Sequence, residues 1–574
     1  MSTDRLGVAN VLEQLAAFLE FRGENPFRVR AFRNAAKAVL GLPGSVADAL
    51  ADGSLAATRG IGPATLAIVK ELQETGQSSL LEDLKRETPA GLLDLLGIPG
   101  LGAPRIKLLH EQLGIDSVAA LEAAARDGRL AALPRFGAKT AEKLLQGIAF
   151  AHRTRTFRLA HHAAREAEVL RSAVERLPGV TRAVVAGEVR RRCEVVSELA
   201  LVAETERPVA ELREEIARFP GLLDPTGAAE LVTFRSAGGM TASIRITPRA
   251  DFGAALAQAT GSPAHLEQLS AHAESVGYSL APAVLLQGGQ PVPVPEESAL
   301  YRVLGLSDIP PELREGFDEI ARAAAGTLPR LVEPADLRGL LHCHTTYSDG
   351  TLGVAEMVHA CQEAGYDYVG ITDHSKSAAY AGGLSVDQLE RQWEEIAAVQ
   401  ARVPGIRILK GIESDILVEG ALDYPDAILA RFDFVIGSIH SRFSLGEAEM
   451  TARVLGALES PYLTILGHPT GRLLLSRNPY PLDLEQLFAA AAANGVALEI
   501  NGDPRRLDLD WRLVRRARAH GVMIAIGADA HGLAGIPNLE FGTAMARKAG
   551  LEQQDVLNTR RADEFLAFAA ARRP

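Results

Sequence analysis

Residues 522–531 read VMIAIGADAH, a short apolar run that ends in an aspartate and a histidine, and six earlier segments share this design. Stretches of helical period separate the runs, and seven such strand–helix units predict a parallel, barrel-like sheet whose site lies at the carboxyl ends of its strands. The other runs are GLLHCH (339–344), YDYVGITDH (366–374), IRILKGIE (406–413), FDFVIGSIH (432–440), LTILGHP (463–469) and VALEIN (496–501).

Nearly every run ends in a potential metal ligand, and six of the chain's 14 histidines lie at these strand ends. A single histidine after a strand is usually an ordinary core or surface residue, but coincidence over seven strands is much less probable. Imidazoles mixed with carboxylates suit Zn, Mn or Fe, so we predict two or three divalent ions, bridged by Glu413, that hydrolyse a phosphoester. The nine predicted ligands are His342, His344, Asp349, His374, Glu413, His440, His468, Asp529 and His531.

The composition bounds the remaining possibilities. A chain of 574 residues is too long for one core, and we expect several domains. Three scattered cysteines fit neither a disulfide framework nor a thiolate metal site, and we expect a cytoplasmic monomer without a membrane segment. The net charge of −12 argues against general adhesion to DNA, so any nucleic-acid contact should be local and directed at the backbone.

The seven motifs resemble those of the polymerase and histidinol phosphatase (PHP) domain, among them HCHTTYSDG (342–350), GIESDI (411–416) and GADAHG (527–532). The resemblance implies one metal on His342, His344, Glu413 and Asp529, a second on Glu413 and His440, and a third on Asp349 and His374, with His468 and His531 unassigned. The segments GHPTGRLLLSR (467–477) and EINGDPRRLDL (499–509) are similar to the PHP form attached to bacterial family X DNA polymerases. Four basic residues are candidates to hold phosphate oxygens, although surface charge is the plainer interpretation for the last two: Arg472, Arg506, Lys376 and Arg442.

The amino-terminal 150 residues show short amphipathic helices punctuated by glycine, and we expect them to be all-helical. RGIGPATLAIVKEL (59–72), IPGLGAPRIKLL (98–109) and, more weakly, LPRFGAKTAEKLL (133–145) have the turn of a helix-hairpin-helix, which offers backbone N–H groups to a DNA phosphate, although a helix cap has the same pattern. ENPFRVRAFRNAA (24–36) resembles the amino-terminal domain of family X polymerases, but Ile68 stands where some relatives carry a lyase lysine. The predicted DNA-contacting glycines are Gly60, Gly62, Gly100 and Gly102.

The middle of the chain mixes helices with strand-like runs, ELALVAE (198–204) and ASIRIT (242–247). GEVRRRCEVVSELALV (187–202) resembles the family X palm motif, in which aspartates hold Mg ions against a nucleoside triphosphate. Those three aspartates align with Glu198, Ala200 and Ser243, and Glu188 replaces a serine. We therefore predict a degenerate palm without bound Mg. The basic residues Arg190 and Arg191 are predicted either to contact the DNA backbone or to form a solvated face.

Together the motifs resemble a bacterial family X DNA polymerase fused to a PHP domain. The resemblance implies an all-α helix-hairpin-helix region, an α+β nucleotidyltransferase-like palm and thumb, and a distorted (β/α)7 PHP barrel. The expected domains are an 8-kDa-like domain (1–78), a fingers-like domain (79–150), the palm (151–235), the thumb (236–320), a linker (321–335) and the PHP domain (336–574).

The function favoured is a Mn- or Zn-dependent 3′–5′ exonuclease or end-processing phosphoesterase in DNA repair, including base excision repair, acting on gapped, nicked or 3′-ended DNA. The predicted catalytic residues are Glu413, Asp529, His440, Arg472 and Arg506. Three alternatives remain: an active gap-filling polymerase, a small-molecule phosphatase of the histidinol phosphatase type, and a noncatalytic DNA-binding protein with structural metals.

Overall fold

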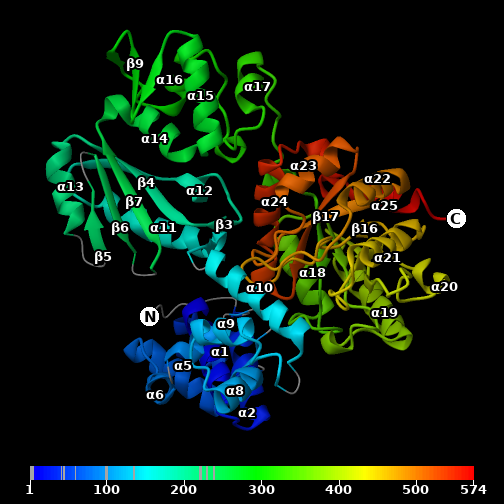
Figure 1. Ribbon diagram of the computed structural model, residues 1–574. Coiled ribbons are helices and arrows are strands. Elements are labelled where there is room, and N and C mark those ends of the chain that lie inside the picture. The colour runs from blue at the N-terminus through cyan, green and yellow to red at the C-terminus, as the bar shows by residue number, and fades with distance from the viewer. Residues whose placement is uncertain are drawn as a thin grey trace. The chain divides into compact units, whose positions relative to one another are not determined.

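The computed structural model describes residues 5–40, 42, 45–58, 60–88, 90–96, 98, 101–133, 136–154, 156–218, 223–227, 230–236 and 239–574. The chain divides into two compact units, one of residues 1–155 with 532–534 and the other of the remaining residues (Figure 1). Among the described residues, no helix is both long and apolar enough to cross a membrane.

The amino-terminal unit is helical, as predicted. One hydrophobic core joins buried side chains between residues 8 and 84, and a second joins those between 92 and 148. Gly76 and Gly114 have positive φ angles and end α5 and α8, which accounts for the glycine punctuation. The helices are α1 (Arg5–Phe21), α2 (Pro26–Leu40), α3 (Val46–Ala51), α4 (Ser54–Ala57), α5 (Pro63–Thr75), α6 (Ser79–Glu87), α7 (Ala90–Leu96), α8 (Ala103–Leu113), α9 (Val118–Arg126) and α10 (Ala138–Thr154).

A five-stranded sheet of order β2-β4-β7-β6-β5 forms the palm-like region at the start of the second unit. β4 is buried along all but its first residue, which explains its apolar sequence. The strands are β2 (Val180–Ala186), β4 (Glu198–Thr205), β5 (Leu223–Thr226), β6 (Leu231–Arg235) and β7 (Thr241–Thr247), with the short pair β1 (Arg158–Leu159) and β3 (Val195–Val196). The helices are α11 (Ala160–Glu175), α12 (Gly187–Arg190) and α13 (Val209–Ala217).

The thumb-like region has its own core, between residues 254 and 331. The predicted linker 321–335 begins inside its last helix, and Val332 donates a backbone hydrogen bond to Leu551 at 2.9 Å. This segment is therefore packed, which corrects the linker prediction; its buried Leu331 and Val332 provide the apolar contacts. The elements are α14 (Phe252–Thr260), α15 (Pro263–Ser275), β8 (Ser279–Ala281), β9 (Val284–Gln287), β10 (Gln290–Val292), α16 (Glu297–Val303) and α17 (Glu319–Ala325).

The carboxy-terminal domain is an eight-stranded parallel sheet of order β13-β12-β11-β18-β17-β16-β15-β14, drawn from green to red in Figure 1. The predicted run IRILKGIE splits into β13 and β14, which lie at opposite edges of the sheet, so seven runs supply eight strands. We call the gap between these two edge strands the seam. The backbone of Glu413, at the start of β14, pairs across it with that of His374, which follows β12. The strands are β11 (Gly339–Cys343), β12 (Tyr368–Ile371), β13 (Arg407–Lys410), β14 (Glu413–Asp415), β15 (Ile436–Ser438), β16 (Ile465–Leu466), β17 (Ala497–Asn501) and β18 (Ile524–Ala530).

Helices follow most of these strands, as expected for strand–helix units. They are α18 (Val354–Glu363), α19 (Val386–Arg402), α20 (Asp426–Leu429), α21 (Glu447–Glu459), α22 (Leu484–Asn494), α23 (Trp511–Ala519), α24 (Asn538–Lys548) and α25 (Ala562–Ala570).

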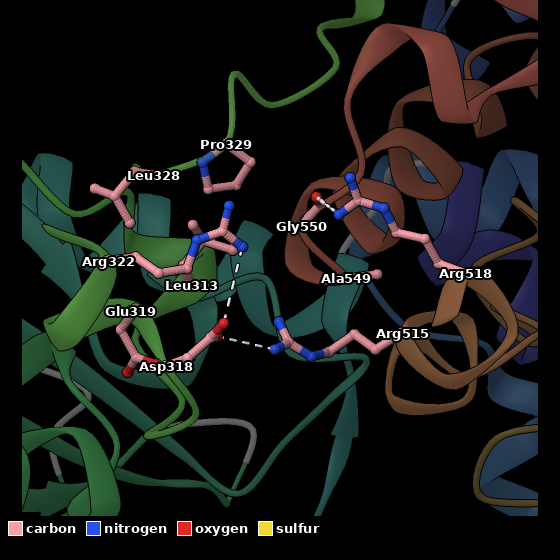
Figure 2. Close-up of a pocket in the computed structure, with 10 residues that line it drawn as sticks. All are labelled: Leu313, Asp318, Glu319, Arg322, Leu328, Pro329, Arg515, Arg518, Ala549 and Gly550. Carbon is pink, nitrogen blue, oxygen red and sulfur yellow. Dashed lines mark hydrogen bonds and ion pairs between the residues drawn. The ribbon is translucent and has the colours of Figure 1, made fainter. Parts of the chain in front are cut away.

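A small cavity of about 110 Å³ lies where the thumb-like region meets α23 and the end of α24. Figure 2 shows Asp318 between Arg322 and Arg515, while Arg518 donates to the carbonyl of Gly550 at 2.9 Å. The arginines around this cavity are thus paired with protein groups, and the residues that line it include none of the predicted metal ligands.

Candidate metal centre

The ends of the barrel strands converge on Glu413. Its two carboxylate oxygens lie between 2.9 and 3.7 Å from side-chain nitrogens of five histidines, and Glu413 itself is 1% exposed. These histidines come from four different strand ends, so the parallel topology alone gathers them. They are His342, His344, His374, His440 and His468.

Two aspartates complete the cluster. Asp529 Oδ1 lies 3.3 Å from His344 Nε2, 3.6 Å from His531 Nδ1 and 3.7 Å from His342 Nε2. Asp349, in the turn after β11, has its Oδ1 3.2 Å from His531 Nε2. All nine predicted ligands therefore lie in one cluster.

The donor atoms separate into four overlapping groups, within each of which they lie within 4.8 Å of one another. His468 joins His342 and Glu413, and His531 joins Asp349, so the geometry gives a place to the two histidines that the motifs left unassigned. The groups are His344–Asp349–His374–His531, His342–Glu413–His468, His342–His344–Asp529 and His374–Glu413–His440.

The chemistry of these donors fits divalent metal ions. Buried polar atoms are normally hydrogen-bonded, yet His342 Nε2, both ring nitrogens of His344 and Glu413 Oε2 are buried without a hydrogen-bond partner. His342, His468 and Asp529 also have positive φ angles, a costly backbone conformation that is typical of functional sites. A set of imidazoles and carboxylates without thiolates favours Zn, Mn or Fe.

The sequence analysis missed an outer layer of carboxylates. Glu499 Oε1 lies 2.6 Å from His342 Nδ1, and its Oε2 accepts the backbone N–H of His468 at 2.6 Å. Asp415 Oδ1 lies 2.5 Å from His440 Nδ1. A proton on each Nδ1 leaves the Nε2 lone pair free to bind a metal. Glu499 lies in the segment VALEIN and Asp415 in GIESDI, and this position in the ligand-bearing segments could have identified them from the sequence.

The electrostatics favour the metal-binding forms of His344 and Glu413. Burial, with the neighbouring His531 and His374, lowers the pKa of His344 to about 3, so its imidazole is neutral at neutral pH. Burial alone would raise the pKa of Glu413, but His440, His342 and His374 hold it well below its usual value. Glu413 is therefore an ionised carboxylate that can bridge two cations.

Of the predicted phosphate-binding arginines, Arg506 lies at the cluster and Arg472 does not. Arg506 Nε is 3.6 Å from Asp529 Oδ2, and its side chain is 19% exposed. Arg472 donates to Asp510 at 2.6 Å, to the carbonyl of Arg506 at 3.0 Å and to that of Leu507. These bonds correct the prediction for Arg472, which holds the loop that carries Arg506.

The palm-like sheet brings the degenerate positions together. Ala200 on β4 is opposite Ser243 on β7, and Glu198 is exposed at the start of β4. Glu188 accepts hydrogen bonds from the backbone N–H of Ser197 at 2.6 Å and from its hydroxyl at 2.9 Å. Alanine and serine supply no carboxylate, and Glu188 already has partners within the palm.

Arg190 and Arg191, predicted either to contact the DNA backbone or to form a solvated face, both pair with acidic residues of the thumb-like region. Arg190 Nη1 lies 2.8 Å from Glu297 Oε1, and Arg191 Nε lies 3.0 Å from Glu315 Oε1. Arg191 is only 8% exposed. In this structure both guanidinium groups are therefore engaged in ion pairs within the protein.

Two of the predicted DNA-contacting glycines occupy helix starts. Gly62 and Gly102 are the N-cap residues of α5 and α8. Gly60 has φ +98°, and a Cβ there would lie 3.3 Å from the carbonyl oxygen of Asn34. Gly100 lies outside the described residues.

Comparison with known proteins identifies the modules. Family models match residues 5–78 (helix-hairpin-helix domain), 92–149 (SAM-like helix-hairpin-helix tandem), 255–315 (DNA polymerase beta thumb) and 341–502 (PHP domain). Helix-hairpin-helix and polymerase modules imply DNA binding, and PHP domains are metal-dependent.

The relatives agree with these modules. The DNA polymerase/3′-5′ exonuclease PolX of Bacillus subtilis (strain 168) is 34% identical over 568 residues, 98% of each chain. Probable phosphatases of Thermoanaerobacter sp. (strain X514) and Caldicellulosiruptor bescii are each 28% identical, over 229 and 236 residues, which cover 38% and 40% of this chain and 89% and 93% of theirs. Because the first similarity runs along nearly the whole chain and agrees with the matched modules, the protein belongs to the family X DNA polymerases (PolX) that carry a PHP domain.

Proposed function

We propose that the PHP domain is a metal-dependent 3′–5′ exonuclease or DNA-end-processing phosphoesterase that acts in DNA repair, with Mn or Zn as its ions. The observation that carries the proposal is the convergence of five imidazoles on the two oxygens of buried Glu413. Divalent ions held there would supply an activated water and neutralise charge on the phosphodiester during in-line displacement.

The residues of the chain have distinct tasks in this proposal. Glu413 and Asp529 would hold the cations, and Asp415 orients His440 at 2.5 Å. Arg506 offers a positive charge beside Asp529 to a phosphate oxygen, which adds a charge-assisted hydrogen bond. No side-chain nucleophile is required.

We further propose that the palm is catalytically silent and serves as a scaffold that positions DNA. Ala200 and Ser243 lie side by side where two-metal nucleotidyl transfer would need carboxylates. Gapped or nicked DNA would be gripped through the helix starts at Gly62 and Gly102, without reading sequence.

A nuclease assay on 5′-labelled gapped and 3′-recessed duplexes with Mn or Zn tests the proposal. The wild-type protein should shorten the strand from its 3′ end, whereas Glu413→Ala and the isosteric Glu413→Gln should be inactive with unchanged DNA affinity. Glu419→Ala, which removes an exposed carboxylate of the same domain, is the matched control. Equal activity in the Glu413 variants would remove the mechanism.

The similarity to probable phosphatases favours a small-molecule phosphatase as the second candidate. Rates on histidinol phosphate and p-nitrophenyl phosphate, compared with rates on a 3′-recessed duplex, separate the two. The helix-hairpin-helix modules have no task in monoester hydrolysis, so we expect the duplex to be the better substrate.

A further inference from the structure

Tyr380 combines high exposure with a position beside the buried metal cluster. The residue is 71% exposed, and its ring centroid lies 6.2 Å from that of His374 and 6.3 Å from that of His440. Both imidazoles contact Glu413. An aromatic side chain open to solvent therefore stands next to the atoms that would hold a scissile phosphodiester.

The segment that carries Tyr380 is tied to the domain on both sides. The ring extends from the short turn Ala379–Ala381. Before this turn, Ser377 donates its backbone N–H and its hydroxyl to the two oxygens of Asp423, at 2.7 and 2.5 Å. After it, Leu384 donates its backbone N–H to the carbonyl of His374 at 2.9 Å. The fixed backbone holds the exposed ring near the cluster, so little ordering is required when a ligand contacts it.

Carboxylates and arginines both lie within electrostatic reach of the Tyr380 hydroxyl. They are Asp415, Glu413 and Asp349, together with Arg506 and Arg477. The Arg477 guanidinium lies over the ring of Phe443, 4.3 Å from its centroid. An exposed aromatic ring at a site that also carries arginines is a combination that binds single-stranded nucleic acid, because bases stack on the ring and cations face the phosphates.

We propose that Tyr380 stacks on the unpaired base of the 3′-terminal nucleotide while the adjoining phosphodiester lies at the metal centre. Tyr380 is thus a specificity-determining residue that favours a nucleotide end over a phosphate monoester without a base. The proposal rests on the exonuclease function proposed above.

One change in the protein, combined with one change in the substrate, tests the stacking directly. Wild-type protein and Tyr380→Ala are compared on single-stranded oligonucleotides that end either in a normal nucleotide or in an abasic residue. On the normal end, Tyr380→Ala should raise KM by roughly 5- to 150-fold, with kcat much less affected. On the abasic end, wild type should already show the higher KM, and Tyr380→Ala should add little.

Two further variants separate the ring from its hydroxyl and from general surface effects. Tyr380→Phe should keep the wild-type KM and kcat, because it retains the ring. Val418→Ala, which truncates another exposed apolar residue of the domain, should leave both constants unchanged.

Three results would overturn the stacking proposal. They are an equal effect of Tyr380→Ala on both ends, no effect on either end, or a loss of kcat in Tyr380→Phe, which would assign the role to the hydroxyl. If wild type fails to degrade either oligonucleotide, the exonuclease function itself fails; an active wild type with an insensitive Tyr380→Ala refutes the stacking alone.

Discussion

Glu499→Gln removes an outer carboxylate while nearly preserving its shape. Glu499 is 1% exposed, and its two oxygens face His342 Nδ1 and the backbone N–H of His468, each at 2.6 Å. Glutamine offers one oxygen and one NH2 group, so one of these two donors loses its acceptor. The backbone N–H of His468 cannot change, and we expect the amide oxygen to stay there. The NH2 group then favours a proton on His342 Nε2, the nitrogen that lies 3.3 Å from Glu413 Oε1.

That tautomer blocks the lone pair that His342 needs for a metal. Loss of such outer support typically reduces metal affinity or activity by about 10- to 100-fold, or roughly 1.4–2.7 kcal/mol. Competition of the metal-free protein with a chromogenic chelator measures the affinity, and nuclease rates over a range of Mn concentrations should show recovery at high metal. The matched control is Glu447→Gln, at an exposed position of the same domain. Unchanged affinity in Glu499→Gln, or an equal loss in the control, would refute the reasoning.

Three further predictions follow from the packing and the palm. Lys548→Ala should lower the free energy of unfolding by about 2–4 kcal/mol, because it leaves the largely buried carboxylate of Glu315 with Arg191 as its remaining ion-pair partner; urea denaturation of the full chain measures this loss, and an unchanged midpoint would contradict it. Arg472→Ala should reduce kcat/KM on DNA by about 10- to 100-fold with metal affinity retained, since it frees the loop that carries Arg506; steady-state kinetics and chelator competition check both parts, and wild-type kinetics would oppose it. Primer extension with dNTPs and Mg or Mn should yield no product, and stepwise nucleotide addition would show that the palm is active.

The barrel and the clustering of the candidate ligands were predictable because one physical rule links them. In parallel strand–helix units, each strand end meets the others at one rim, so a histidine or carboxylate that terminates an apolar run has a defined position. The seam was not predictable. The segment IRILKGIE resembles a single strand, whereas in the structure it forms β13 and β14, which lie at opposite edges of the sheet. Glu499 was missed because the sequence does not show which histidine it faces.

The basic cluster of the palm illustrates a second limit. Arg190 and Arg191 are adjacent to a motif that resembles a nucleotide-binding segment, which made a phosphate partner plausible. Their actual partners, Glu297 and Glu315, lie 107 and 124 residues later in the chain. Local patterns carry no information about ion pairs formed at such separations, so only the tertiary structure distinguishes a surface arginine from a buried one.

The same segment connects the palm to the PHP domain. Glu194 accepts hydrogen bonds from Trp511 Nε1 at 3.2 Å and from Arg512 Nη1 at 2.7 Å, and it is 6% exposed. Lys548, which is 1% exposed, donates to the carbonyl of Arg191 at 3.0 Å. Removing a partner of a buried charge such as that of Glu194 or Lys548 leaves the charge less compensated, which costs more than losing a surface contact would. These residues therefore have a structural reason to be charged that is independent of nucleotide chemistry. Their charge cannot be taken as support for polymerase activity in a palm whose opposed Ala200 and Ser243 carry no carboxylate.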